Sequence, residues 1–214
     1  MASNPSKRRR TDDDEHLVPK TTFTGALLEV GKGGDLFLKA GTGAQGCLIQ
    51  VHSFCLKLAS PVFKAMLEGP FIESTTSYTA KQPLLLPDDD GAAFLELCQI
   101  LHHHPSYSQR LDILPQLVML ADKYQCLEAV RPHVQSALSP HFSNIAAEGI
   151  PLDSHAHLVE AMCIAYIVLD EQLFHRTSAT VLVNGKWHLV HNQSKRFEGL
   201  LPPSMIGKIH IAFS

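Results

Sequence analysis

The chain has 214 residues, of which 45% are hydrophobic and 18% charged, and its formal net charge is -3 with histidine neutral. This composition is ordinary for a globular protein that buries a core without disulfides or metals, and the small charge excludes a global field that attracts nucleic acid or membranes. No apolar run approaches the ~20 residues of a membrane span, and none follows the basic N-terminal cluster, so we expect neither membrane insertion nor secretion.

Residues 1–20 are polar, carry blocks of opposite charge and contain almost nothing to bury, which predicts a disordered tail. A basic block in this tail has two interpretations: a nuclear localisation signal, or a solvated run that the acidic residues 12–15 partly neutralise. The block consists of Lys7, Arg8, Arg9 and Arg10.

Two short apolar runs, 35–40 and 47–52, bracket the Gly-rich segment GTGAQG and predict a β-hairpin. Neither this segment nor the GKGG segment before it has the spacing of a phosphate-binding loop, so both are predicted to be turns. After His52 the apolar residues recur at intervals of three and four, which predicts two short helices separated at Ser60-Pro61, with Ser60 as the N-cap of the second. The apolar positions of this period are Phe54, Leu58, Val62, Phe63, Met66 and Leu67, and the first helix is expected to pack inward.

A brief strand is predicted within 82–90, and three aspartates at its end lie where a helix begins, at the positive end of the helix dipole. The helix that follows is predicted to end around the sequence HHHPSYS, and two more helices are predicted over 112–124 and 127–138. Each has an apolar stripe at helical spacing. The stripes are Phe94, Leu97, Cys98 and Leu101; Leu114, Leu117, Val118 and Ala121; and Leu127, Val130 and Val134.

From Ser139 the sequence is less regular. A further helix is then predicted over 155–169, with Leu169 among its inward residues. Residues 177–190 have two interpretations that the sequence leaves open, either a hairpin around Asn184-Gly185 or the continuation of a helix. The sequence indicates no internal repeats.

Five cysteines, at positions 47, 55, 98, 126 and 163, include no C-x-x-C pair. Their odd number and their spacing predict neither a disulfide framework nor a thiolate metal site. We therefore expect reduced and mostly buried thiols in a nuclear or cytoplasmic protein.

This order of elements, and the residues at its junctions, resemble the BTB/POZ domain in the divergent form common in fungal proteins. The resemblance covers about residues 25 to 138 and is carried by GDLFLKA, QVHSFCLKLASPVFKAML, LLLPDDDGAAFLELCQILH and LPQLVMLADKYQCLEAVRPHV. The residues that match the fold signature are Asp35, His52, Ser60 and Phe63. It implies an α+β fold with a small mixed sheet on a helical core over 21–138 and a mainly helical extension over 139–214. The HHH run departs from the family, which often has Tyr and then Thr-Gly there.

The resemblance also implies a protein-interaction module, because many BTB domains associate with themselves or with cullin-3 ubiquitin ligases. Family adaptors carry a hydrophobic–x–Glu motif, and Phe94 and Glu96 are the candidates here; otherwise Phe94 only begins the core stripe and Glu96 is an exposed helix residue. The N-terminal segment exchanges between subunits in many family members. Leu27, Leu28 and Val30 are the candidates for such a homodimer, because they have no assured partner within the chain.

Three patterns resemble catalytic or metal sites, namely His52 with Ser53 or Ser60, His52 with Cys55, and the HHHP and HAH runs. No G-x-S-x-G elbow is present, so we expect a structural His52 and a buried Cys55 rather than a nucleophile with its base. Neighbouring histidines on a helix face apart, so they do not converge on one ion. We expect no enzyme activity, no cofactor and no metal.

The sequence is consistent with two functions. The first is an interaction module that serves as a substrate adaptor for a cullin-3 ubiquitin ligase. The second is a nuclear BTB protein that regulates transcription through a DNA-binding partner. Direct contact with nucleic acid is not expected, because the sequence has no zinc-finger spacing, basic helix or leucine zipper.

Overall fold

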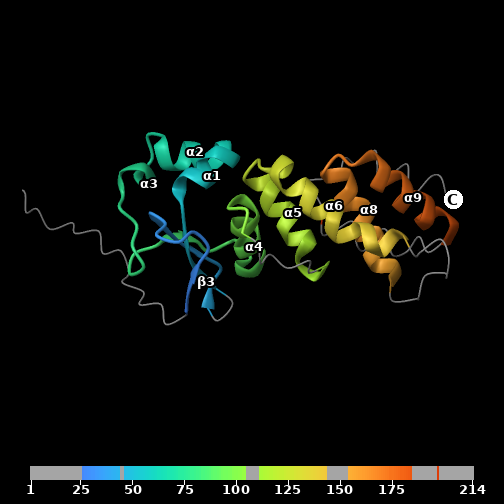
Figure 1. Cartoon of the computed structure of the whole chain (residues 1–214), viewed down its shortest axis with the longest axis horizontal. Coiled ribbons are helices and arrows are strands. Elements are labelled where there is room, and N and C mark those ends of the chain that lie inside the picture. The colour runs from blue at the N-terminus through green and yellow to red at the C-terminus, as the bar shows by residue number, and fades with distance from the viewer. Residues whose placement is uncertain (1–25, 44–45, 105–110, 144–153, 185–196, 198–214) are drawn as a thin grey trace, which may run out of the picture.

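The computed structural model describes residues 26–43, 46–104, 111–143 and 154–184, together with Phe197. Within them a four-stranded mixed sheet and the helices α1 to α3 lie at one end of an elongated molecule, and a row of helices leads to the other end (Figure 1). The α+β class, with a small mixed sheet and a C-terminal helical stretch, is confirmed. The helices are α1 (Ser53–Ala59), α2 (Pro61–Glu68), α3 (Ile72–Thr75), α4 (Gly91–Leu101), α5 (Leu114–Lys123), α6 (Leu127–Ser143), α8 (Ser154–Ile167) and α9 (Glu171–Asn184), with a 3-10 turn at Leu111–Ile113.

The sheet has the order β1-β3-β2-β4. Its strands are β1 (Leu27–Glu29), β2 (Leu36–Ala40), β3 (Cys47–Val51) and β4 (Leu84–Leu86). The central pair is the antiparallel hairpin that the sequence predicts, with Leu38 opposite Ile49. Both edge strands pair in parallel, β1 with β3 and β4 with β2. Alternate residues of β2 are buried, as expected for a strand with one face on the core.

One glycine explains how the chain enters this hairpin. A Cβ atom on Gly34 would lie 2.3 Å from the carbonyl oxygen of Val51, at the end of the neighbouring strand β3. Only glycine allows the two backbones to approach so closely at this position.

The predicted break between α1 and α2 is confirmed. The Ser60 hydroxyl accepts a hydrogen bond from the Phe63 amide at 3.0 Å and therefore caps α2, and it donates to the Tyr124 carbonyl oxygen at 2.5 Å. The predicted inward face of α1 is wrong, because Phe54 and Leu58 are 68% and 76% exposed while Leu56 is buried. Residues four apart share one side of a helix, but their spacing does not say which side another element covers.

An aromatic cluster joins α2, α4 and the end of α5. The Phe63 ring stacks on Tyr124 with 4.3 Å between centroids, and Phe94 contacts both rings edge-on at 6.2 and 5.8 Å. The hydroxyl of Tyr124 donates to the buried carboxylate of Asp89, which Lys123 also binds. This cluster therefore connects the sheet end of the molecule to the helical row.

The predicted stripes of α4 and α5 are buried, which confirms the period used to place these helices. Helix α6 continues to Ser143, so the domain boundary expected after Leu138 falls within a continuous helix. Helix α8 ends at Ile167, and Leu169, which was predicted to face inward, is 70% exposed. It lies in the turn after the helix with a φ of 55°, so it no longer follows the helical period. Of the two interpretations of 177–190, the helix holds through Asn184, and the remaining positions lie outside the described residues.

The α5–α6 and α8–α9 connections use the same type of turn. In the first turn Gln125 has a φ of 53°, and the next amide, of Cys126, donates to the Ala121 carbonyl at 2.8 Å. In the second turn Leu169 has a φ of 55°, and the Asp170 amide donates to the Ala165 carbonyl at 2.9 Å. Both turns carry the hydrogen bond that closes a helix with a left-handed residue.

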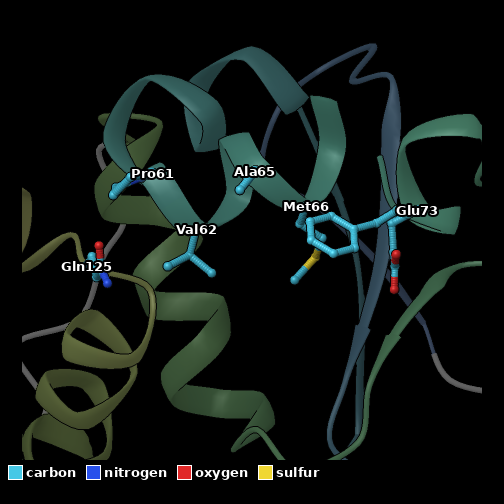
Figure 2. Close-up of a pocket in the computed structure, with 7 residues that line it drawn as sticks. Pro61, Val62, Ala65, Met66, Glu73 and Gln125 are labelled. Carbon is cyan, nitrogen blue, oxygen red and sulfur yellow. The ribbon is translucent and has the colours of Figure 1, made fainter. Parts of the chain in front are cut away.

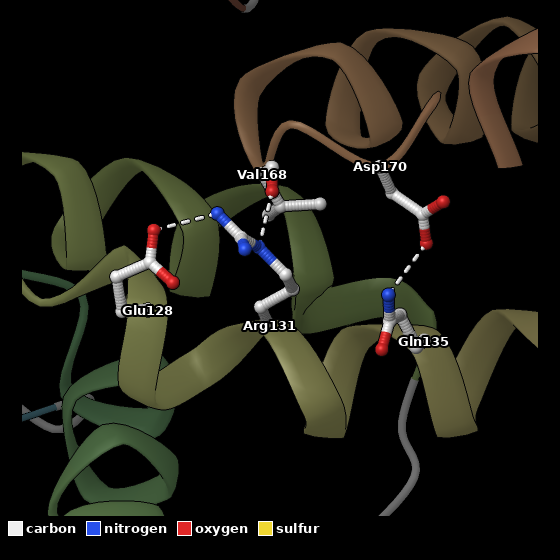
Figure 3. Close-up of polar contacts among 5 residues, drawn as sticks. All are labelled: Glu128, Arg131, Gln135, Val168 and Asp170. Carbon is white, nitrogen blue, oxygen red and sulfur yellow. Dashed lines mark hydrogen bonds and ion pairs between the residues drawn. The ribbon is translucent and has the colours of Figure 1, made fainter. Parts of the chain in front are cut away.

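Helix α6 holds the second turn through two side chains (Figure 3). Arg131 donates from Nε to the Val168 carbonyl oxygen at 2.6 Å, and its Nη2 lies 2.6 Å from the Glu128 carboxylate. Gln135 donates to one oxygen of the Asp170 carboxylate at 2.8 Å, and the other oxygen caps the first turn of α9. A cation at the C-terminal end of α8 also opposes the negative end of its helix dipole. These contacts fix the α8–α9 hairpin on α6.

Candidate protein-interaction site

A pocket of about 480 Å³ lies between α2, α3 and the turn that joins α5 to α6 (Figure 2). Most of its lining is apolar, with one carboxylate and one amide. The lining residues are Pro61, Val62, Ala65, Met66, Phe71, Glu73 and Gln125. Phe71 is 53% exposed at this site, so the pocket has apolar surface that is open to solvent.

Helix α2 forms one wall of the pocket, and its two sides have different surroundings. Phe63 points into the aromatic cluster and is fully buried, whereas Val62 and Met66 lie on the side that lines the pocket. The start of α2 is held by Ser60, and this residue bonds to the carbonyl of Tyr124, the neighbour of Gln125. The same hydrogen bond therefore positions both walls of the pocket.

The link between α2 and α3 presents Phe71. The Gly69 amide donates to the Ala65 carbonyl oxygen at 2.8 Å, and a Cβ on Gly69 would lie 2.3 Å from that oxygen. The Ser74 hydroxyl donates to the Phe71 carbonyl at 2.7 Å, which fixes the backbone at the start of α3. Phe71 is thus held by a tight connection although its ring faces solvent.

The predicted cullin contact at Phe94 and Glu96 is not available at the surface. Phe94 is 0% exposed within the aromatic cluster, and Glu96 is 4% exposed, with its carboxylate 3.2 Å from Nε2 of His133 in α6. Side chains this buried cannot contact another protein, so the assignment to these two residues is wrong. The same hydrophobic–x–Glu spacing occurs at Phe71 and Glu73, which both line the pocket.

The sequence contained a signal for this second position. Phe71 and Glu73 lie outside the apolar stripes, between Pro70 and the polar segment that follows α3, so no core position is predicted for Phe71. The stripe of α4, by contrast, accounts for Phe94 as a core residue.

The residues predicted for strand exchange have partners within their own chain. Leu27 and Leu28 belong to β1 and lie opposite Leu48 and Ile49 of β3, and Val30 is only 9% exposed. The premise that they lack an intrachain partner is therefore wrong. Leu27 is still 42% exposed, but Phe54 and Leu58 of α1 are more exposed, at 68% and 76%.

The fold-signature residues Asp35 and His52 lie at the junction between β3 and α1. Asp35 accepts hydrogen bonds from the Ser53 amide at 2.7 Å and from its hydroxyl at 2.6 Å. Burial alone would raise the pKa of Asp35, but these bonds outweigh it and lower the pKa below its usual value. Ser53 is thus a structural partner of Asp35, and the hydroxyl of Ser60 is fully buried against Tyr124, so neither is arranged as a nucleophile with His52 as its base.

The histidine runs do not form a recognisable metal site in the part of the chain that the structure describes. Within those residues no three His, Cys, Asp or Glu side chains are grouped so that they can hold an ion. The buried thiols of Cys98, Cys126 and Cys163 have raised pKa values, chiefly because burial disfavours the thiolate. The basic block Lys7 to Arg10 and the HAH side chains lie outside the described residues.

Among the helices of the described ranges, none combines the length and apolar character needed to cross a bilayer. No known family model matches this chain, and no curated protein matches it. The BTB/POZ resemblance accordingly stays a prediction.

Proposed function

We propose that this chain is a protein-interaction module of the BTB/POZ type that acts as a substrate adaptor for cullin-3 ubiquitin ligases and performs no chemistry of its own. The observation that carries the proposal is the apolar pocket beside α2, with Phe71 exposed and Glu73 on its lining. The BTB/POZ resemblance supplies the class of partner.

The pocket has the composition of a binding hot spot. Such sites centre on an aromatic anchor in an apolar surface, with polar groups that orient the partner. Phe71 supplies the anchor, and the flexible thioether of Met66 can adapt to the shape of an inserted side chain. The carboxylate of Glu73 selects a partner that places a cation or an N–H donor next to its apolar contact.

The test is direct binding of the purified chain to the N-terminal region of cullin-3 by calorimetry. Phe71→Ala should weaken binding at least tenfold, and Glu73→Lys should do the same by reversing the charge on the lining. Leu85→Ala is the matched control, because Leu85 is 54% exposed but lies on the edge strand β4 and does not line the pocket.

Three outcomes decide the proposal. A loss for both pocket variants with an unchanged control supports the site and the partner. Wild-type affinity in Phe71→Ala refutes the site. Absence of any binding by the folded wild-type chain refutes cullin-3 as the partner.

We also propose that the chain forms a homodimer through α1 rather than through exchange of β1. Phe54 and Leu58 are four residues apart on one face of α1 and are more than two-thirds exposed, which is unusual for large apolar side chains. Light scattering after size exclusion should give a dimer mass for the wild type and a monomer mass for Leu58→Asp. A wild-type monomer at high concentration excludes this dimer.

A further inference from the structure

His102, the C-cap residue that follows α4, is held by two backbone groups. Its Nδ1 lies 2.8 Å from the carbonyl oxygen of Cys98, and its Nε2 lies 3.0 Å from the amide nitrogen of His52. A carbonyl oxygen only accepts a hydrogen bond and an amide N–H only donates one. Nδ1 must therefore carry the proton and Nε2 must be bare, so the surroundings select one neutral form of the ring.

This ring joins parts of the chain that are distant in sequence. His52 lies 50 positions before His102, between the end of β3 and the start of α1. The two imidazole rings stack with 6.2 Å between centroids and an angle of 27°. His52 also packs against Gly31, where a Cβ would lie 2.7 Å from the His52 ring. The bond from His52 to His102 thus holds the β3–α1 junction against the end of α4.

The charged and titratable groups around His102 do not favour its protonation. His52 across the junction and His103 on the same helix end both oppose a positive charge on His102 when they are protonated. The carboxylate of Asp35, which interacts with His52, is engaged by the amide and hydroxyl of Ser53. Burial is the main cause that lowers the pKa of His102 below its usual value, and the bond to Cys98 only partly offsets it.

We propose that His102 is an acid-sensitive latch, which holds the start of α1 on the end of α4 while the ring is neutral and releases it when Nε2 gains a proton. Protonation places an N–H on Nε2 opposite the His52 N–H, and two donors at 3.0 Å repel each other. The proton comes from solvent, and no covalent bond other than N–H forms. The inference needs no partner and is independent of the cullin-3 proposal.

The experiment is NMR on the full chain between pH 7.5 and 5, which follows the ring of His102 and the hydrogen-exchange protection of the His52 amide. The pKa of His102 should lie below 6.5, and the protection factor of His52 should fall about tenfold for each pH unit below that pKa, because each unit changes the ratio of neutral to charged ring tenfold. His102→Gln keeps a neutral acceptor and should remove this pH dependence. His175→Gln, on the exposed side of α9, is the control and should keep it.

A protection factor of His52 that stays constant across this range in the wild type overturns the latch. So does a pH dependence that persists unchanged in folded His102→Gln. If His102→Gln does not fold, the wild-type measurements decide alone, since a His102 pKa at or above 6.5 also contradicts the inference.

Discussion

Replacing Ser60 with alanine removes a side chain that both caps α2 and binds the end of α5. The hydroxyl is fully buried, accepts from the Phe63 amide at 3.0 Å and donates to the Tyr124 carbonyl at 2.5 Å. Loss of an N-cap costs about 1 kcal/mol. A buried carbonyl left without its donor costs about 1–3 kcal/mol more. Ser60→Ala should therefore lower the free energy of unfolding by about 2–4 kcal/mol.

Urea denaturation followed by circular dichroism measures this change as a lower midpoint with an unchanged slope. Ser74→Ala is the matched control, because the Ser74 hydroxyl makes a comparable bond at 2.7 Å to the Phe71 carbonyl, but in a solvent-exposed setting. The control should lose no more than about 0.5 kcal/mol. A loss under about 1 kcal/mol in Ser60→Ala, or one equal to that of Ser74→Ala, would refute the reasoning from burial.

Three further changes test the fold. Gly34→Ala places a Cβ 2.3 Å from a backbone carbonyl of β3 and should prevent the soluble native fold. Gly43→Ala is the control, because its Cβ meets no atom within 4 Å although Gly43 has a φ of 60°. Its free energy of unfolding, measured by thermal denaturation, should fall by only about 1–2 kcal/mol. Arg131→Ala should raise the amide hydrogen-exchange rates of α8 and α9 more than those of the sheet, because it removes the bond from α6 to the end of α8. Equal changes in both regions would contradict this. Burial lowers the pKa of His133, and Glu96 opposes this shift. The unfolded chain therefore binds more protons below pH 6.5, and the free energy of unfolding should fall as the pH drops through that value. In His133→Asn the free energy of unfolding should depend less steeply on pH between 6.5 and 5, and an unchanged dependence would contradict the assignment.

The elements that are determined by residues close together in the sequence could be predicted from it. The hairpin, the break at Ser60-Pro61 and the stripe of α5 follow from turn residues, capping and period, and all three are confirmed. The exposure of Phe54 was not predictable, because period assigns a residue to a helix face, while the other elements decide whether that face is covered.

The candidate site was located less well, for a related reason. Phe94 and Phe71 both stand two residues before a glutamate, and only their tertiary surroundings separate a buried core ring from an exposed one. The contact between His52 and His102 joins residues 50 positions apart and involves a backbone amide, which carries no sequence signal. The turn shared by the α5–α6 and α8–α9 connections carries no sequence signal, because its common feature is a left-handed backbone conformation, and two different residues, Gln125 and Leu169, adopt it.

The parallel pairing of both edge strands has a consequence for synthesis on the ribosome. Once the hairpin has emerged, β1 can cover β3 at once, but the outer edge of β2 stays open until Leu84–Leu86 leaves the exit tunnel. During that interval the unpaired amides and carbonyls of β2 can pair with another chain. A truncated transcript that ends before β4, or a translational pause in the α1–α3 segment, should therefore yield aggregates, and any expressed fragment must extend past Leu86 to close its sheet.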